Sequence, residues 1–372
     1  MQIPLSKPDI TNLEIQYVTD VLKSGNLSLG DKVRAFEQKF EEWLRISHAV
    51  AMNSGTSALH VAVKSLGLKP GDEVITSPYS FVASSNCLLF EGVKPVFVDV
   101  HPDTTVMNED LIEAAITDKT KAILVVHIFG HPCNMEKIMD IANRYQLKVI
   151  EDACESIGAT WNGQYTGTFG DISVFAFYPN KQMTTGEGGM LVTNNTHIYE
   201  MAKSLRNQGR SVKNEWLVHE RLGYNYRLSD VHAAIGVAQM ERIQDILTKR
   251  EQAATRYHTL IQKHTVPVTH LQCHPAATIS WFVYPILLPN QVNRDEVMAK
   301  LSEKGVQTKP YFPSIHLQSF YQDMLNTKTG DFPVSEMLAQ RSLALPFFNN
   351  ITMEEQTYVI ETLLSILKEQ GA

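Results

Sequence analysis

Between residues 50 and 195, short apolar runs alternate with segments of helical periodicity. The apolar runs are rich in β-branched residues and bounded by Gly, Pro or Asp, which is typical of buried strands. They are DEVITSP, KPVFVDV, KAILVVHIFG, KVIEDA, ISVFAF and GMLVTN. The helical patterns between them are TSALHVAVKSLG, NEDLIEAAI and EKIMDIANRYQ. The first of these helices ends at Gly67, which occupies the position of a C-terminal cap.

Continuous apolar strands that alternate with helices indicate an α/β fold whose mainly parallel sheet is covered on both faces. In such sheets, ligands collect at the carboxyl ends of the strands. Polar residues that directly follow an apolar run are therefore the first candidates for a functional role.

A long helix is predicted over RLSDVHAAIGVAQMERIQDIL, residues 227–247, with Ser229 as its N-cap. The pattern changes after this helix. SWFVYPILLP reads as an apolar strand, and a helix is expected from about Arg294 to Lys304. The proline-rich KPYFPSIH follows, and a last helix begins at Met353. These segments predict a smaller α/β unit at the C-terminal end.

The length of 372 residues exceeds that of one ordinary hydrophobic core, so two domains are expected. We place a large domain at residues 1–248 and a small C-terminal domain at residues 249–372. The formal net charge of −7 and the lack of a Lys/Arg block argue against a nucleic-acid or membrane partner. The first residues, MQIPLSKPDITNLE, lack the features of a signal peptide.

The four cysteines are far apart and form no CxxC pair, which is typical of thiols in a reducing cytoplasm; they are Cys87, Cys133, Cys154 and Cys273. We therefore expect a cytoplasmic protein. His127, His131 and Cys133 lie close together in VVHIFGHPCNM and could be read as metal ligands. Their spacing fits no standard zinc pattern, so we expect no metal there.

The first residues of the helix that follows the strand near residue 50 could bind a phosphate group. Gly55, Thr56 and Ser57 open the helix in NSGTSALHVAV. Free backbone amides, two hydroxyl groups and the positive end of the helix dipole would converge at this point. An ordinary helix N-cap is the alternative interpretation.

Two further strand ends carry residues that could contact a planar ring. Tyr79 and Phe81 follow the strand EVITSP, where an aromatic face could stack on a ligand ring or simply belong to the core. Asp152 follows the buried strand in KVIEDACES. A buried carboxylate needs a partner, and the protonated nitrogen of a pyridine ring would serve.

Lys181 lies where the apolar run of FAFYPNKQMTTGEGG ends and a glycine-rich turn begins. A solvated loop cation is the ordinary interpretation, because lysine is rarely buried. The alternative is a nucleophilic amine that forms an imine with a carbonyl compound. A phosphate cradle, a stacking ring, a pyridinium partner and an imine-forming lysine are together what pyridoxal phosphate (PLP) requires.

Several segments in order resemble the DegT/DnrJ/EryC1/StrS family of sugar aminotransferases over roughly residues 5 to 320. They are NSGTSALH, DEVITSPYSFVASSN, KPVFVDV, TKAILVVHIFGHPCNM, VIEDACESIGA, GTFGDISVFAFYPNKQMTTGEGGMLVTNN, LRNQGR and RLGYNYRLSDVHAAIGVAQMERI. The resemblance implies the aspartate-aminotransferase fold (fold type I) and a homodimer whose active sites lie at the subunit interface.

The resemblance also assigns roles to residues. Lys181 matches the lysine that forms an imine with the cofactor, and Asp152 matches the partner of its ring nitrogen. Thr56 and Ser57 match residues of the phosphate cradle, and Phe81 matches the stacking aromatic residue.

Four more residues match positions near substrate or partner subunit. Asn225 in GYNYR resembles the residue that reaches the neighbouring subunit's cofactor phosphate. Arg227 could pair with a substrate carboxylate or phosphate, or form a structural salt bridge. Tyr311 and His316 in YFPSIH resemble a segment that lines the sugar-nucleotide side.

The chain departs from the common family pattern at two positions. Ala176 stands where many members have a serine that supports the phosphate, which puts one phosphate hydrogen bond in doubt. Glu155 stands where many members have His or Gln, and we count it among the cofactor-contacting residues. Glutamate occurs in a subset that includes perosamine synthase-like enzymes, and GHPC and NKQMTTGEGG resemble the same subset.

The resemblance implies a PLP-dependent aminotransferase that moves an amino group from an amino acid, by analogy L-glutamate, to a nucleotide-linked keto-deoxysugar. Such enzymes serve polysaccharide and amino-sugar biosynthesis. One alternative is a PLP-dependent sugar dehydratase, but in those relatives histidine replaces the lysine found here as Lys181. A non-catalytic regulator on the same scaffold is the other alternative. Such a protein would be expected to lose Lys181 or Asp152, and both are present.

Overall fold

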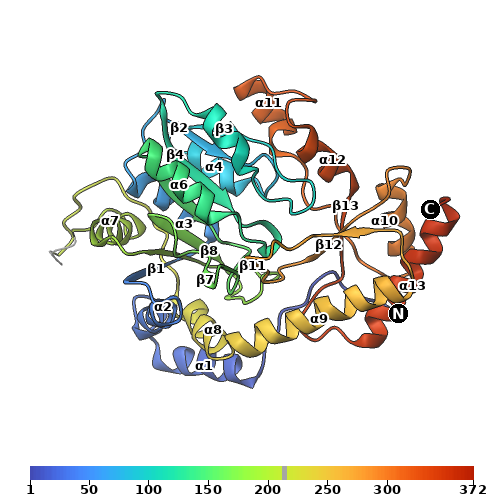
Figure 1. Cartoon of the computed structure of the whole chain (residues 1–372). Helices are drawn as coiled ribbons and strands as arrows, with labels where there is room; N and C mark the ends of the chain where they lie inside the picture. Colours follow the sequence, from blue (N-terminus) through green and yellow to red (C-terminus); the bar gives the residue numbers. More distant parts are fainter. Residues whose placement is uncertain (212–215) are drawn as a thin grey trace.

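The computed structural model describes residues 1–211 and 216–372. Its centre is a seven-stranded sheet with the strand order β1-β9-β8-β5-β4-β2-β3 (Figure 1). The strands are β1 (His48–Met52), β2 (Glu73–Thr76), β3 (Lys94–Phe97), β4 (Thr120–Val126), β5 (Lys148–Asp152), β8 (Ile172–Ala176) and β9 (Gly189–Thr193). All neighbouring pairs from β3 to β8 are parallel, and β9 is antiparallel to both of its neighbours. The predicted α/β class with a mainly parallel sheet is confirmed.

The register of β4 and β5 brings their carboxyl ends to one edge of the sheet. Leu124 pairs with Ile150, and Val126 pairs with Asp152. All of β5 except its first residue is buried, as its apolar run predicted. Asp152 therefore lies at the carboxyl end of a central buried strand.

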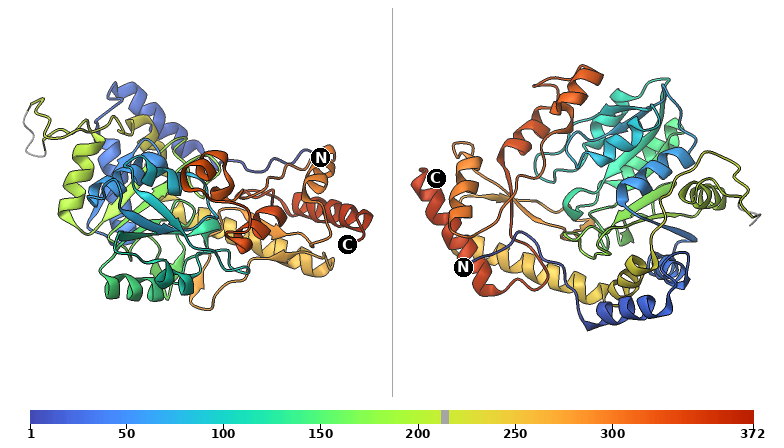
Figure 2. Two further views of the ribbon diagram at one scale, coloured as in Figure 1. Left: turned by 90° about the horizontal axis from the view of Figure 1, so that it is seen from above. Right: turned by 180° about the vertical axis from the view of Figure 1, so that it is seen from behind.

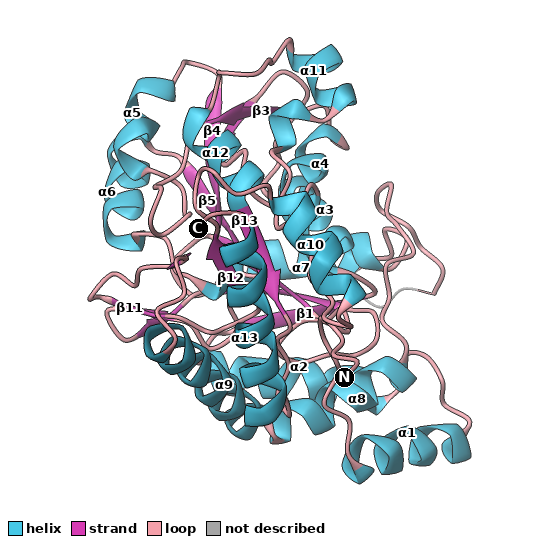
Figure 3. Cartoon of the chain, turned by 90° about the vertical axis from the view of Figure 1, so that its right-hand side faces the viewer, coloured by secondary structure: helices cyan, strands magenta, loops and turns pink. Residues whose placement is uncertain are grey.

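Helices cover the sheet on both sides: α5 and α6 lie on one side of the strands, and α3 and α4 lie on the other (Figure 3). Their bounds are α3 (Gly55–Ser65), α4 (Ala83–Leu89), α5 (Ile112–Ala115), α6 (Met135–Tyr145) and α7 (Thr196–Arg206). Helix α3 begins after Ser54, whose hydroxyl accepts a hydrogen bond from the Ser57 amide. Gly67 follows the helix with φ 71°, as predicted for a glycine cap.

The long helix predicted over residues 227–247 is wrong at one point, because it is interrupted at Arg242. Helix α8 (Asp230–Glu241) is capped by Ser229 as expected, and helix α9 (Ile243–Lys263) begins after the break. Arg242 has φ −106° and ψ 6°, and its guanidinium forms ion pairs with Asp9 at 3.1 Å and Glu14 at 2.8 Å. These contacts hold Arg242 toward the N-terminal segment, a long-range constraint that helical periodicity does not report.

Helix α9 runs beneath the molecule to a second, smaller unit (Figure 1). This unit holds the sheet β10-β12-β13 and its own hydrophobic cluster. Its elements are β10 (Thr269–His270), β12 (Tyr284–Leu287), β13 (Ser342–Leu345), α10 (Arg294–Glu303) and α13 (Met353–Glu369). The helices predicted from Arg294 and Met353 are confirmed.

Both chain termini lie at this end of the molecule (Figure 2). Ile3 forms a bridge with Val306 and belongs to the second hydrophobic cluster. The boundary expected at residue 248 falls inside helix α9, and the division into two domains remains a prediction.

The remaining elements surround these two units. They are α1 (Asn12–Ser24), α2 (Asp31–Leu44), β6 (Thr160–Trp161), β7 (Gln164–Tyr165), β11 (Ala277–Thr278), α11 (Ser319–Leu325), α12 (Pro333–Arg341) and the short 3-10 helices η1 (Glu109–Leu111), η2 (Ile128–Gly130) and η3 (Ile315–Leu317). Among the described helices, none combines the length and the apolar character needed to cross a lipid bilayer.

Candidate active site

A cavity of about 810 Å³ lies at the carboxyl ends of the central strands. Thr56 at the start of α3, Asp152 at the end of β5, and Lys181 in the loop after β8 all line it. Phe81 and Tyr311 also line the cavity, from opposite parts of the chain. Five separate sequence segments thus meet where an open α/β sheet is expected to bind its ligand.

Asp152 is 4% exposed, and both of its carboxylate oxygens accept hydrogen bonds. The Ser84 hydroxyl donates to Oδ2 at 2.7 Å, and the Cys154 amide donates to Oδ1 at 3.1 Å. The Ser84 hydroxyl also lies 2.8 Å from that of Ser80. These contacts hold the carboxylate at the cavity wall. There it can accept a hydrogen bond from the protonated nitrogen of a ligand ring.

Lys181 projects into the cavity from a closed loop. Two backbone hydrogen bonds of Phe177, each 3.0 Å long, close the loop. The Phe177 amide donates to the Gly188 carbonyl, and the Phe177 carbonyl accepts from the Thr185 amide. A Cβ on Gly188 would lie 2.3 Å from the Thr185 hydroxyl, so the turn after the lysine requires glycine there. The tight turn therefore sets where the lysine amine can reach.

The Lys181 amine donates a hydrogen bond to Glu155 Oε1 at 3.1 Å. The other oxygen of Glu155 accepts from the Phe129 amide at 2.8 Å. Burial raises the pKa of the Glu155 carboxyl, while the Lys181 ammonium and the Phe129 amide act in the opposite direction. Glu155 therefore touches the lysine directly, and its contact with the cofactor stays a prediction.

The amino end of α3 offers backbone donors to the cavity. The Ser54 hydroxyl accepts a hydrogen bond from the Ser57 amide at 3.0 Å and lies 2.8 Å from the Ser57 hydroxyl. Within the described chain, no hydrogen bond occupies the amides of Gly55 and Thr56. Those two residues line the cavity, whereas Ser57 is not among its described lining residues.

Gly55 is required for this arrangement because a Cβ there would lie 2.6 Å from the Ala176 Cβ. Ala176 lines the cavity but carries no hydroxyl group, so the departure noted in the sequence removes a donor from this wall. The free amides at residues 55 and 56 and the Thr56 hydroxyl remain available to an anion.

The residues present fit PLP. A cavity of this volume accommodates the cofactor, and it contains an amine, a carboxylate and unoccupied amides at a helix N-terminus. Asn180 adds a buried amide oxygen with no hydrogen-bond partner within the described part of the chain. Phe81, 57% exposed, supplies an aromatic face at the wall.

Besides Ser57, three predicted residues are not brought into the cavity of their own chain. Asn225 is exposed, and Arg227 donates to the Asn207 side chain at 2.8 Å. His316 is fully buried in η3 and bonds to Glu336 at 3.0 Å, so it faces α12 instead of the cavity. Tyr311 does line the cavity, and its hydroxyl accepts a bond from the Asn180 side chain at 3.4 Å.

Sequence reasoning missed several lining residues. Asn180 directly precedes the lysine, and Ser84 lies in the aromatic segment YSFVASS, so adjacency to a motif could have indicated both. Phe282 and Lys309 come from the C-terminal part of the chain. No local pattern marks them, because their positions depend on how the second unit packs against the first.

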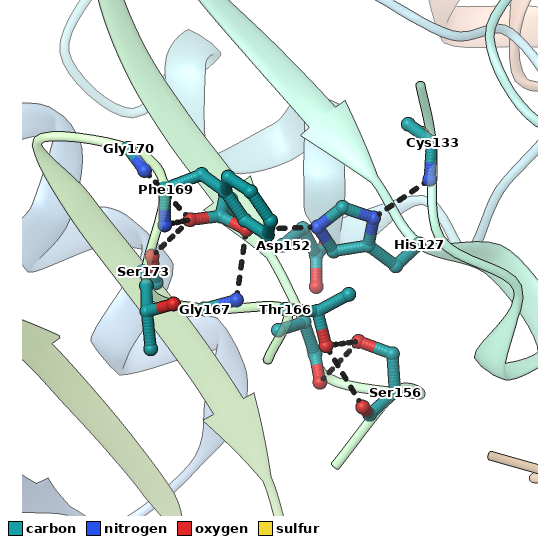
Figure 4. A network of polar contacts seen from close by, with 12 residues as sticks. His127, Cys133, Asp152, Ser156, Thr166, Gly167, Phe169, Gly170 and Ser173 are labelled. Atoms are coloured by element: carbon teal, nitrogen blue, oxygen red, sulfur yellow. Dashed lines mark hydrogen bonds and ion pairs between the residues drawn. The ribbon is translucent and has the colours of Figure 1, made fainter. Parts of the chain in front are cut away.

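The histidine cluster of the sequence is accounted for by a buried network beside the site (Figure 4). His127 bonds through Nε2 to Glu151 at 3.0 Å, and its Nδ1 accepts from the Cys133 amide at 3.1 Å. Because Nδ1 accepts, Nε2 carries the proton. Glu151 also accepts from the Ser173 hydroxyl and from three backbone amides, those of Gly167, Phe169 and Gly170.

This network governs the charge of Glu151 and secures the strand that carries Asp152. Burial acts to raise the pKa of Glu151, but the hydrogen bonds from His127 and the glycine amides outweigh it and lower the pKa. His131, the second histidine, contacts the carbonyls of Pro132 and Gln272. Among the described residues, no group of three metal-binding side chains is present.

The family model described as the DegT/DnrJ/EryC1/StrS aminotransferase family matches residues 8–364. GDP-perosamine synthase from Escherichia coli O157:H7 is 37% identical over 362 residues, which cover 97% of each chain. Among solved structures, Helicobacter pylori PseC, an aminotransferase of pseudoaminic acid biosynthesis, superposes with a TM-score of 0.92 at 27% identity, covering 99% of this chain and 100% of that one. The PLP form of Spr1654 from Streptococcus pneumoniae, described as a sugar aminotransferase, gives a TM-score of 0.94 at 25% identity with full coverage of both chains.

Proposed function

Since the chain belongs to the DegT/DnrJ/EryC1/StrS aminotransferase family, we propose that it transfers an amino group from L-glutamate to a nucleotide-linked keto-deoxysugar. The enzyme class is aminotransferase and the cofactor is PLP, as in its homologues. One observation supports the site assignment above the others. The Lys181 amine, the Asp152 carboxylate and the free amides at the start of α3 line the same cavity.

Bound PLP supplies a protonated ring that withdraws electrons from the carbon that loses a proton. Each residue then has a distinct task. The amides of Gly55 and Thr56 and the Thr56 hydroxyl hold the phosphate group. The Asp152 carboxylate holds the proton on the ring nitrogen, and Phe81 covers one ring face. Lys181, once released, would be the base that takes the proton from the α-carbon of the donor, and it would then carry that proton at Nζ for the following step.

The acceptor site is proposed to lie at the mouth of the cavity, beside Tyr311. The ligands of this enzyme are anionic, yet among the described lining residues only Lys181 and Lys309 are cationic. Lys181 is engaged with Glu155, whereas Lys309 is exposed. We assign Lys309 to the diphosphate of the nucleotide sugar, because a mobile ammonium group suits a phosphate oxygen. The E. coli relative, a GDP-perosamine synthase, supports a nucleotide-linked sugar as acceptor.

A homodimer with shared active sites completes the proposal. The cavity lining of one described chain has three carboxylates, Asp152, Glu155 and Glu187, against two lysines. This cavity is proposed to bind a cofactor phosphate, an amino acid and a nucleotide diphosphate. Further hydrogen-bond donors from a second chain would stabilise these anionic groups. Asn225 and Arg227 lie outside their own cavity, which supports their use in the cavity of a second copy.

An absorption spectrum tests this function most directly. The protein is incubated with PLP, freed of excess cofactor, and titrated with L-glutamate. We expect a visible band of the lysine-bound cofactor that L-glutamate converts to a band in the near ultraviolet. A protein without a visible band after incubation would contradict cofactor binding. A visible band that persists with L-glutamate but responds to another amino acid would contradict the donor assignment.

A further inference from the structure

The GYNYR segment, residues 223–227, is extended and is bonded to other parts of the chain. Asn225 and Arg227 each form an isolated antiparallel bridge. Side chains alternate between the two sides of an extended segment. Tyr224 and Tyr226 therefore share one side, and the exposed Asn225 lies on the other.

The two tyrosine rings stack on each other and end in polar groups of the protein body. Their centroids are 4.8 Å apart, and their planes are inclined by 11°. The Tyr224 hydroxyl donates to Glu91 Oε1 at 3.1 Å, and the Tyr226 hydroxyl lies 3.1 Å from His60 Nδ1. His60, 6% exposed, closes the circuit, because its Nε2 lies 2.8 Å from the same oxygen of Glu91. We call these four residues the tyrosine network.

The tyrosine network is fixed to helix α3. His60 lies on this helix, and Lys64, one turn further along it, donates to the second oxygen of Glu91 at 2.7 Å. The Tyr226 carbonyl also accepts from the Asn53 amide at 2.9 Å, just before α3 begins. Hydrogen-bond networks of partly buried groups fix the geometry of the elements that they join. The position of the GYNYR segment is therefore set relative to α3.

We propose that the tyrosine network positions Asn225, holding its segment so that the amide side chain points away from its own chain and toward the cofactor phosphate of a second copy. The inference rests on the proposed function, in which Asn225 serves the neighbouring site. A donor that is already held in place loses less conformational freedom when it binds. Without the network, binding the phosphate would first have to order the GYNYR segment.

The double variant Tyr224→Phe/Tyr226→Phe removes both hydroxyl groups and keeps both rings. The cofactor-free protein is titrated with PLP and, separately, with pyridoxal, which lacks the phosphate group. We expect the Kd for PLP to rise roughly fivefold and the Kd for pyridoxal to stay within about twofold of the parent value. Tyr145→Phe is the matched control, since its hydroxyl donates to the exposed Glu113 at 2.9 Å, and it should change neither Kd. Equal rises for both ligands in the double variant, or no rise for PLP, would overturn the proposal.

Asn225→Ala separates positioning from a general effect on packing. If the tyrosine network acts only through Asn225, adding the two tyrosine changes to Asn225→Ala should raise the Kd for PLP by less than about twofold. Independent effects would instead multiply, and that outcome would overturn the proposal. Should the double tyrosine variant not fold, Tyr224→Phe alone is compared in the same way.

Hydrogen exchange of the cofactor-free protein gives a second readout. The Tyr224 amide donates to the Leu205 carbonyl at 2.7 Å, and the Tyr226 amide donates to the Arg206 carbonyl at 3.0 Å. We expect peptides covering residues 223–227 to exchange roughly tenfold faster in the double tyrosine variant, because the segment opens more often. Unchanged exchange would overturn the proposal. Failure of the parent protein to bind PLP would contradict the proposed function alone, because the exchange result needs no cofactor.

Discussion

At the residue scale, two buried carboxylates three positions apart in the sequence have different surroundings. Asp152 accepts from a serine hydroxyl and a backbone amide. Glu155 accepts from a backbone amide and from the Lys181 amine, and burial raises its pKa. Distinct environments for neighbouring acids commonly separate their roles. Here Asp152 is placed to hold a ring proton and Glu155 to receive the lysine.

The first prediction concerns Lys181 itself. In Lys181→Ala the amine that moves the proton is gone, so we expect turnover with L-glutamate to fall by at least about three orders of magnitude. PLP should still be retained without the visible band, because the phosphate contacts at α3 are unchanged. Stopped-flow spectroscopy of the half-reaction measures both effects. Lys309→Ala is the matched control and should leave the donor half-reaction unchanged; substantial turnover by Lys181→Ala would contradict the assignment.

At the scale of elements, a glycine allows the second unit to approach the lysine loop. Gly130 in η2 has φ +85°, and a Cβ there would lie 1.7 Å from the Ser280 carbonyl oxygen. The Ser280 amide donates to the Gly130 carbonyl at 3.0 Å. This contact brings the segment with Phe282 against the end of β4.

The second prediction compares two glycines with positive φ. Gly130→Ala would force two backbone segments apart, so we expect it to lower the free energy of unfolding by more than about 3 kcal/mol. Gly25→Ala, at φ +74° with open space around it, should cost only about 1 kcal/mol. Urea denaturation measures both values. Equal losses would show that backbone conformation, not the approach of residue 280, determines the requirement for glycine.

The third prediction is a pH dependence at η1. Glu109 binds His101 at 2.9 Å and the Asn134 side chain, the N-cap of α6, at 2.9 Å. Burial acts to raise the pKa of Glu109, but the bonds from His101, its own amide and Asn134 outweigh it and lower the pKa to about 2. Because the folded-state pKa lies below the unfolded value, the stabilisation is complete above pH 4.5 and is lost as the pH falls toward about 2.

Glu109→Gln measures this contribution. After allowance for solvent screening at His101, whose side chain is 30% exposed, we expect the variant to lose about 1–2 kcal/mol at pH 7. The difference from the parent should shrink steadily below pH 4.5. Glu113→Gln, an exposed residue paired with Arg144 at 3.0 Å, is the control and should cost about 0.5 kcal/mol or less. A difference between parent and Glu109→Gln that does not change with pH would contradict the assigned ion pair.

At the scale of the whole molecule, local sequence patterns predicted the helices and strands better than they predicted the contacts between them. The strands of the large sheet and the position of Asp152 followed from apolar runs, because a parallel sheet buries both faces. The break at Arg242 depends on acids more than 200 positions earlier, and the position of Phe282 depends on Arg250. Residues such as these are selected by tertiary packing, which leaves no periodic signal in the sequence.

Local sequence patterns are equally limited in predicting how two chains associate, as Asn225 and Arg227 show. Both belong to GYNYR, the motif that the family resemblance marks as specific, yet neither lines the cavity of its own chain. Asn225 is exposed and forms an isolated bridge with Asn207. Within the described residues Arg227 donates to the Asn207 side chain, whereas the Asn225 side chain forms no hydrogen bond; a second copy would give Asn225 a cofactor phosphate.

The last prediction tests whether two chains share each site. Lys181→Ala removes the amine, and Asn225→Ala removes the donor proposed to reach the neighbouring cavity. If the sites are shared, a mixed dimer of the two variants contains one site with both defects and one with neither. The purified mixed dimers should therefore show about half of the parent activity at a PLP concentration too low to load Asn225→Ala, because each mixed dimer has one intact site.

The experiment requires co-expression with two affinity tags, so that mixed dimers are purified and compared with each variant alone. Each variant alone is the control. Asn225→Ala alone should bind the cofactor phosphate more weakly, which raises its Kd for PLP. Recovery of activity in the mixed dimers can arise only when Lys181 and Asn225 of different chains serve one site. If Asn225 served its own chain, every site would carry one defect, and activity would not exceed the average of the two variants.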